Sequence, residues 1–134
     1  MIIARTLRDR VVAHARLDAP NECCGLIAVR DGRAVTVHEA ENTAASPFRF
    51  EVDGMALHRE LTAIEDRGDE LGAIYHSHTR SEPYPSQTDV NFSVGWPGVE
   101  WLIVGLASGD EPVVRCFRID DGVVTETGVE VVDG

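Results

Sequence analysis

The chain has 134 residues, of which 43% are hydrophobic and 26% are charged, a length and composition that exclude a disordered or fibrous protein and favour one soluble globular domain over residues 1–134. The formal net charge of −11, without any basic cluster, argues against a nucleic acid partner. No hydrophobic run reaches the roughly 20 residues of a membrane helix and no signal sequence is evident, so we expect a cytoplasmic protein without a membrane partner.

The first forty residues predict a helix and then a hairpin. Thr6 and Asp9 resemble a capping box, and hydrophobic residues recur at helical spacing until Pro20 closes the segment. Residues 24–29 and 34–38 are apolar runs on either side of an Asp-Gly pair, which is a strong hairpin signal. We therefore expect one helix followed by two antiparallel strands.

The next segment predicts a loop, a short strand and a second helix. Residues 41–47 are small and polar, as in a loop, and residues 48–52 alternate in the manner of a strand. Asp53 can cap a helix that Gly68 ends. The buried face of this helix is expected to carry Leu57, Leu61 and Ile64.

The second half of the chain is rich in predicted strands. Residues 71–78 form an apolar run typical of a buried strand, followed by a loop over 79–85 and a short helix over 86–92. Further strands are predicted over residues 100–107, 113–119 and 123–132. The order of helix, strands, helix and strands indicates an α/β or α+β sheet flanked by helices.

Two histidines end the predicted strand 71–78. Side chains alternate along a strand, so His76 and His78 share one face while Ser77 points to the other. Asp89 lies eleven residues beyond His78, across a loop that can return its carboxylate to the two imidazoles. Two imidazoles and one carboxylate leave a fourth tetrahedral position for water, as in catalytic zinc sites. The H-x-H spacing alone leaves open a competing interpretation, in which one histidine is exposed and the other is satisfied in the core.

A wider pattern includes these residues. Glu22 lies upstream in the segment PNECCG, and His76, His78, Ser86 and Asp89 follow in the order H-x-H, seven residues, S-x-x-D. This ensemble resembles the JAMM/MPN+ metalloprotease motif, and the resemblance extends over nearly the whole chain. It implies a single JAMM/MPN domain of the cytidine-deaminase-like α/β class, with a mixed central sheet flanked by helices. It also implies one zinc ion held by His76, His78 and Asp89.

The resemblance implies catalytic roles for Glu22 and Ser86. Glu22 would act as general base on the zinc-activated water and pass the proton to the leaving amine. The alternative for Glu22 is a surface cap or salt bridge. Ser86 would donate a hydrogen bond to the oxyanion of the tetrahedral intermediate, whereas its local sequence favours a helix N-cap, and both roles can coexist.

The segment around Thr79 resembles one branch of the family, whose members remove cysteine from the C-terminus of a ubiquitin-like sulfur-carrier protein. The matching residues are Thr79, Glu82, Tyr84, Pro85 and Ser86. The implied partner is a ubiquitin-like or sulfur-carrier protein with a Gly-Gly tail, and residues 41–50 are a candidate wall of the groove that binds it. Many JAMM proteins have proline at the position of Thr79. The sequence is also compatible with a homodimer.

Other reactive side chains have structural interpretations. Cys23 and Cys24 are expected to pack in a buried strand rather than to act as nucleophiles or ligands. The histidines outside the motif and the two tryptophans are expected to be surface, helix or core residues: His14, His38, His58, Trp96 and Trp101. A non-catalytic scaffold of the same fold is the competing function, against which the complete ligand set argues. A cupin or an amidohydrolase fits poorly, since cupins are all-β and the amidohydrolase barrel needs about 250 residues.

Overall fold

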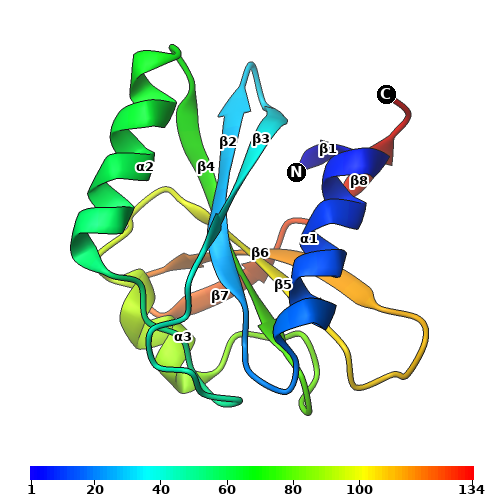
Figure 1. Cartoon of the computed structure of the whole chain (residues 1–134). Helices are drawn as coiled ribbons and strands as arrows, with labels where there is room; N and C mark the ends of the chain where they lie inside the picture. Colours follow the sequence, from blue (N-terminus) through cyan, green and yellow to red (C-terminus); the bar gives the residue numbers. More distant parts are fainter.

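One mixed sheet of eight strands contains both ends of the chain, in a computed structural model that describes residues 1–134. Three helices flank this sheet (Figure 1). In chain order the elements are β1 (Ile2–Ala4), α1 (Arg5–Asp18), β2 (Cys24–Arg30), β3 (Arg33–Ala40), α2 (Gly54–Asp66), β4 (Glu70–His78), α3 (Gln87–Ser93), β5 (Glu100–Gly105), β6 (Val113–Asp120), β7 (Val123–Glu126) and β8 (Glu130–Val132).

The strands lie in the order β7-β6-β5-β4-β2-β3-β1-β8. Strands β4 and β5 are parallel, β2 pairs antiparallel with both β3 and β4, and β1 is parallel to β8. The sheet is therefore mixed, as the family resemblance implied. Its centre is β4, which is hydrogen-bonded on both sides and ends in the two motif histidines.

Two hydrophobic cores lie on opposite faces of the sheet. On one face Ile27 packs with Val12 of α1, and on the other Leu26 packs with Ile64 of α2. Neighbouring residues of β2 thus belong to different cores, as the pleat of a strand requires. Figure 1 shows α1 and α2 on opposite sides of the β2–β3 hairpin. No helix combines the length and the apolar character that a membrane crossing needs.

The second helix begins and ends as predicted. The carboxylate of Asp53 accepts a hydrogen bond from the Ala56 amide at 3.0 Å, which makes it the N-cap of α2. Gly68 follows the helix with φ +78°, a conformation that costs glycine little. Leu57 and Leu61 pack against the core that contains Ile64.

The capping box predicted at the first helix is wrong. Helix α1 begins at Arg5, one residue before Thr6, and its N-cap Ala4 makes no side-chain hydrogen bond. The chain enters the helix directly from β1, a strand of three residues that the sequence pattern did not reveal. Such a short strand depends on its partner, and here the partner is β8 at the other end of the chain.

The strand predicted over residues 48–52 is also wrong, because this segment is an irregular loop. Phe50 is buried and Val52 packs partly against the α2 core, whereas Phe48 is 71% exposed. The alternation therefore arises from two side chains that anchor a loop, with no ladder of backbone hydrogen bonds.

The strand predicted over residues 123–132 is divided in two. Strand β7 ends at Glu126 and pairs with β6, whereas β8 begins at Glu130 and pairs with β1 at the opposite edge of the sheet. Gly128, with φ +82°, lies at the break. The chain must turn here to pair with a strand at the other edge of the sheet, and the apolar pattern of residues 123–132 does not reveal this turn.

Candidate metal centre and active site

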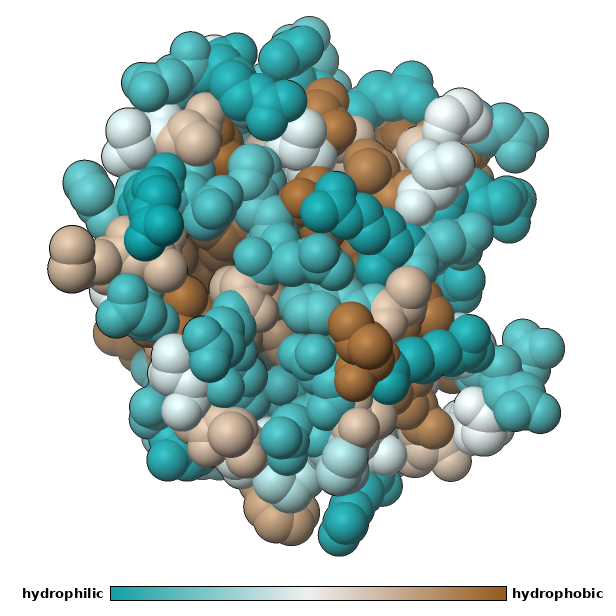
Figure 2. Space-filling view, in the orientation of Figure 1, coloured by the Kyte–Doolittle hydropathy of each residue, from teal (hydrophilic) through white to brown (hydrophobic).

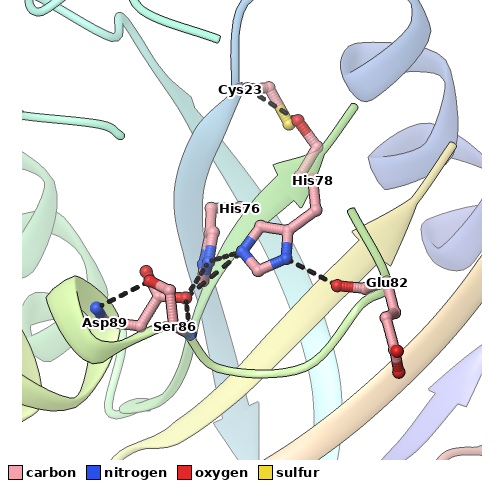
Figure 3. A network of polar contacts seen from close by, with 7 residues as sticks. Cys23, His76, His78, Glu82, Ser86 and Asp89 are labelled. Carbon is pink, nitrogen blue, oxygen red and sulfur yellow. Dashed lines mark hydrogen bonds and ion pairs between the residues drawn. The ribbon is translucent and has the colours of Figure 1, made fainter. Parts of the chain in front are cut away.

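The end of β4 places two imidazole rings on one face of the sheet. His76 is fully buried and His78 is 4% exposed. Their Nε2 atoms lie 3.1 Å apart, and Figure 3 shows both rings directed toward the start of α3. Because β4 is hydrogen-bonded to a strand on each side, the backbone that carries the two histidine side chains is held rigidly.

Helix α3 supplies the carboxylate through its own cap. The Ser86 hydroxyl accepts a hydrogen bond from the Asp89 amide at 3.1 Å, and Asp89 Oδ2 accepts one from the Ser86 amide at 2.9 Å. This capping box holds Asp89 Oδ2 at 3.1 Å from His76 Nε2 and 3.2 Å from His78 Nε2. The turn of helix that satisfies the cap therefore also aims the carboxylate at the histidines.

These three atoms fit a metal ion. The Nδ1 of His78 lies 2.8 Å from the Glu82 carbonyl oxygen, so in the neutral ring this nitrogen carries the proton and Nε2 presents a lone pair. Lone pairs of His76, His78 and Asp89 that converge in this way repel one another unless a cation or a proton lies between them. Ligand atoms around a tetrahedral zinc at its usual bond lengths are about 3.3 Å apart, close to the 3.1–3.2 Å observed.

The surroundings of Asp89 keep its carboxyl ionised. Burial works against ionisation of Asp89, but His76, His78 and the Ser86 amide together hold the pKa of this carboxyl well below its usual range. For His78, burial lowers the pKa, and the hydrogen bonds to Asp89 and to the Glu82 carbonyl outweigh it, so the pKa is raised. Asp89 therefore brings a negative charge to a site that is almost closed to solvent.

Glu22 lies just before β2, at the same end of the sheet. Cys24 pairs with His76 in the β2–β4 ladder, so the chain preceding Cys24 runs toward His78. Glu22 is only 4% exposed, and its Oε1 atom has no hydrogen-bond partner. Burial raises its pKa to about 8, with a smaller opposing effect from His78. This buried, unpaired carboxyl is not the surface cap or salt bridge that the sequence left open.

The sequence matches the model of the prokaryotic homologs of the JAB domain over residues 4–120. The chain belongs to this family. It is 36% identical over 138 residues to the CysO-cysteine peptidase of Mycobacterium tuberculosis, and the alignment covers 99% of this chain and 92% of that protein. It is 41% identical over 108 residues to the desampylase of Haloferax volcanii, covering 75% and 77% of the two chains.

Solved structures agree with the fold of this JAB-family chain. A protein of Desulfitobacterium hafniense has a TM-score of 0.84 at 30% identity, covering 100% of this chain and 94% of that one. A JAB1/MPN domain protein of Archaeoglobus fulgidus has a TM-score of 0.67 at 19% identity, covering 99% and 100%, and supports the fold alone. The predicted resemblance and fold class are thus confirmed, and the similarity to a peptidase and a desampylase over most of the chain supports a hydrolase.

A mainly apolar cleft adjoins the candidate metal centre of the JAB-family chain. Phe50 lines this cleft and stacks on the His76 ring, with ring centroids 4.8 Å apart. Thr43 also lines it, so the segment 41–50 does border a cleft beside the histidines. In Figure 2 the visible surface is largely hydrophilic, and hydrophobic residues show in several small groups, one of which lies beside α2. The other residues that line the apolar cleft include Leu26, Val52, Leu57, Ile74, Phe92 and Trp96.

Two polar residues near the site have no counterpart in the motif-based prediction. Ser77 lies between the two histidines and points to the other face of β4, where it accepts a hydrogen bond from the Cys23 amide at 2.8 Å, which fixes the chain next to Glu22. Asn42 is buried in the loop after β3 and donates to the Glu22 carbonyl at 2.9 Å. Neither has a periodic signal in the sequence, because both act on backbone that is distant along the chain.

The remaining candidates are structural. Cys23 and Cys24 are buried free thiols, and burial raises the pKa of each to about 12, so neither has the character of a nucleophile. His14 lies on α1 but is buried, with Nδ1 2.7 Å from the Tyr75 hydroxyl oxygen. Trp101 is a core residue as expected, whereas Trp96 is only half-buried and lines the cleft.

Proposed function

We propose that this chain is a zinc-dependent peptidase that hydrolyses the bond after the C-terminal tail of a ubiquitin-like or sulfur-carrier protein. The proposal is carried by the convergence of three lone-pair atoms from His76, His78 and Asp89. A second buried carboxyl, Glu22, has no partner at Oε1, and its pKa responds to the charges of His78 and Asp89. The similarity to a CysO-cysteine peptidase and a desampylase supports the substrate class.

The protein groups have distinct tasks in this reaction. Zinc held by the two histidines and Asp89 would make a water molecule acidic near neutral pH and would polarise the scissile carbonyl. Glu22 takes one proton of the attacking water and delivers it to the nitrogen as the carbon–nitrogen bond breaks, which gives a carboxylic acid on the tail and a free amine. The acid then gives up the second water proton, so that near neutral pH the products are a carboxylate and an ammonium group. A pKa raised by burial suits a group that must both accept and release a proton near pH 7.

Ser86 completes the mechanism as a hydrogen-bond donor. Its oxygen already accepts from the Asp89 amide, and this contact occupies one lone pair and leaves the hydroxyl proton free. The proton can therefore serve the oxyanion while the oxygen caps α3, so the two roles predicted for Ser86 are compatible.

The apolar cleft suits an extended tail. A tail ending in Gly-Gly has no side chains near the scissile bond and can approach a buried centre closely. Phe50 and Thr43 would border it, with Phe50 against a ligand histidine. We propose cysteine as the residue released, by analogy with the mycobacterial relative, and the cytoplasm as the compartment, because its reducing conditions suit three buried free thiols.

The decisive experiment combines metal analysis with cleavage. The purified chain would be loaded with zinc and incubated with a carrier protein that ends in Gly-Gly-Cys, and mass spectrometry would follow loss of the cysteine. We expect cleavage that disappears on chelation and returns with zinc. Bound zinc without cleavage of any tail would favour the scaffold function. A chain that binds no metal would contradict both the proposed zinc site and the proposed hydrolysis.

Replacement of Ser86 separates its two roles. Ser86→Gly keeps most of the capping energy, since glycine at an N-cap costs only a few tenths of a kcal/mol, but it removes the hydroxyl. We expect kcat to fall about 100- to 1000-fold, as for loss of one oxyanion donor. Ser86→Thr, which retains both the cap and the donor, should remain close to the wild type. A Ser86→Gly variant with wild-type kcat would leave capping as the only role.

A further inference from the structure

Glu22 is held by a loop instead of by a neighbouring strand. It precedes β2, so neither of its backbone polar groups takes part in the β2–β4 ladder. Its amide donates to the Ser46 carbonyl at 2.9 Å, and its carbonyl accepts from Asn42 Nδ2 at 2.9 Å. Both partners belong to the loop between β3 and α2. The position of Glu22 therefore depends on the conformation of that loop.

The side chain of Asn42 organises the same loop. The residue is 8% exposed, and its amide uses both protons and both lone pairs. Nδ2 donates to the carbonyls of Glu22 and Arg49, at 2.9 and 3.0 Å. Oδ1 accepts from the amides of Ala44 and Glu51, each at 3.1 Å. The opposite amide orientation would set an oxygen against two carbonyls, so the hydrogen-bond pattern determines which atom is nitrogen.

These bonds also fix the wall of the metal centre. The Arg49 carbonyl and the Glu51 amide, both bound by Asn42, flank Phe50 in the chain. The Phe50 ring stacks on His76 at a centroid distance of 4.8 Å and an interplanar angle of 29°. The buried side-chain amide of Asn42 thus connects the backbone of Glu22 to the backbone on either side of Phe50, which packs against His76.

We infer that Asn42 is a positioning residue, which sets Glu22 relative to the metal centre and holds Phe50 against His76. The inference rests on the proposed function of Glu22 as general base. Proton transfer requires a heavy-atom separation of about 2.6–3.2 Å, and a misplacement of about 1 Å can cost roughly 100-fold in rate. A short amide side chain with four bonds is a rigid means of meeting this requirement.

Asn42→Asp is the sharpest variant. It keeps the two acceptor contacts with Ala44 and Glu51 but loses both donors, and it sets a carboxylate oxygen against the Glu22 carbonyl. We expect kcat to fall roughly 100-fold, with a smaller change in KM and one zinc ion still bound per chain. Asp53→Ala, which removes the cap of α2 at the end of the same loop, is the matched control: it should lower the melting temperature and leave kcat unchanged.

Two further measurements distinguish positioning from general destabilisation. In the zinc-free protein the backbone amide hydrogen of Glu22 should exchange faster in Asn42→Asp than in Asp53→Ala. This measurement tests whether Asn42 restrains the Glu22 backbone, and it does not depend on enzyme activity. In a double-mutant cycle, Asn42→Asp should lower kcat much less in a Glu22→Gln background than in the wild type, because its effect acts through Glu22.

The outcomes separate this inference from the proposed function. Equal kcat losses in the two backgrounds or unchanged exchange at Glu22 would each overturn the positioning of Glu22 by Asn42, and a wild-type kcat for Asn42→Asp would overturn both parts of the inference. Full activity of Glu22→Gln would instead contradict the general base, and the exchange measurement would still decide whether Asn42 holds the Glu22 backbone.

Discussion

Glu22→Gln is expected to lower kcat by about 100- to 10,000-fold while one zinc ion per chain remains bound, because an amide of the same shape cannot accept the proton of the attacking water. In the absence of zinc, the folded variant should be at least as stable as the wild type. Glu22 is buried, its Oε1 atom has no partner, and burial raises its pKa to about 8, so the folded site resists a charged carboxylate there. Kinetics with a cleavable tail, metal analysis and thermal unfolding together measure the three effects.

The matched control is Glu100→Gln. Glu100 is a half-buried carboxylate remote from the histidines along the sheet, bound by the Thr127 hydroxyl at 2.7 Å and the Cys116 thiol at 3.1 Å. Its replacement should cost stability and leave kcat intact, the reverse of the result for Glu22. If Glu22→Gln lost its zinc or kept its activity, Glu22 would not be the general base.

Asp89→Asn is expected to abolish stable zinc binding, and hydrolysis with it. The amide oxygen of asparagine can still accept from the Ser86 amide, so the cap of α3 survives. The negative charge that offsets the cation in a buried site is lost, however. Loss of a residue that only supports a zinc ligand lowers the affinity for zinc by about 10- to 100-fold. Because Asp89 is itself a ligand in the proposed centre, its replacement should lower the affinity by more than this.

Zinc titration by calorimetry measures this loss, and thermal unfolding provides an independent readout. Zinc should raise the melting temperature of the wild type and leave that of Asp89→Asn unchanged, since only binding to the folded state stabilises it. Asp69→Asn serves as control: Asp69 is also buried but pairs with Arg30, away from the centre. It should bind zinc as the wild type does. A zinc-dependent shift in Asp89→Asn of wild-type size would contradict the assignment of Asp89 as a ligand.

Local features of the site could be predicted from the sequence because they depend on neighbours within a few residues. The alternation of a strand places His76 and His78 on one face whatever else the protein does. The cap formed by Ser86 and Asp89 closes over three residues, and a short polar segment before a helix is a sufficient signal. The return of Asp89 toward the histidines needed only the requirement for a third ligand.

Other features depended on the tertiary structure because their partners are distant in the chain. Glu22 comes close to His78 only because β2 and β4 pair, and the sequence alone suggested its role mainly through the family resemblance. The loop held by Asn42 has no periodicity, and the alternation at Phe50 predicted a strand where there is none. The pairing of β1 with β8 joins the two ends of the chain.

The sequence by itself therefore determined the family and predicted which three side chains come together, and the evidence for both is a short pattern of residue types. Only the tertiary structure decided the burial of Glu22, the wall that Phe50 makes against His76 and the hydrogen bonds of Asn42. The physical reason is that side-chain periodicity and capping are set by local backbone geometry, whereas burial and long-range hydrogen bonds arise only when the sheet brings distant segments together.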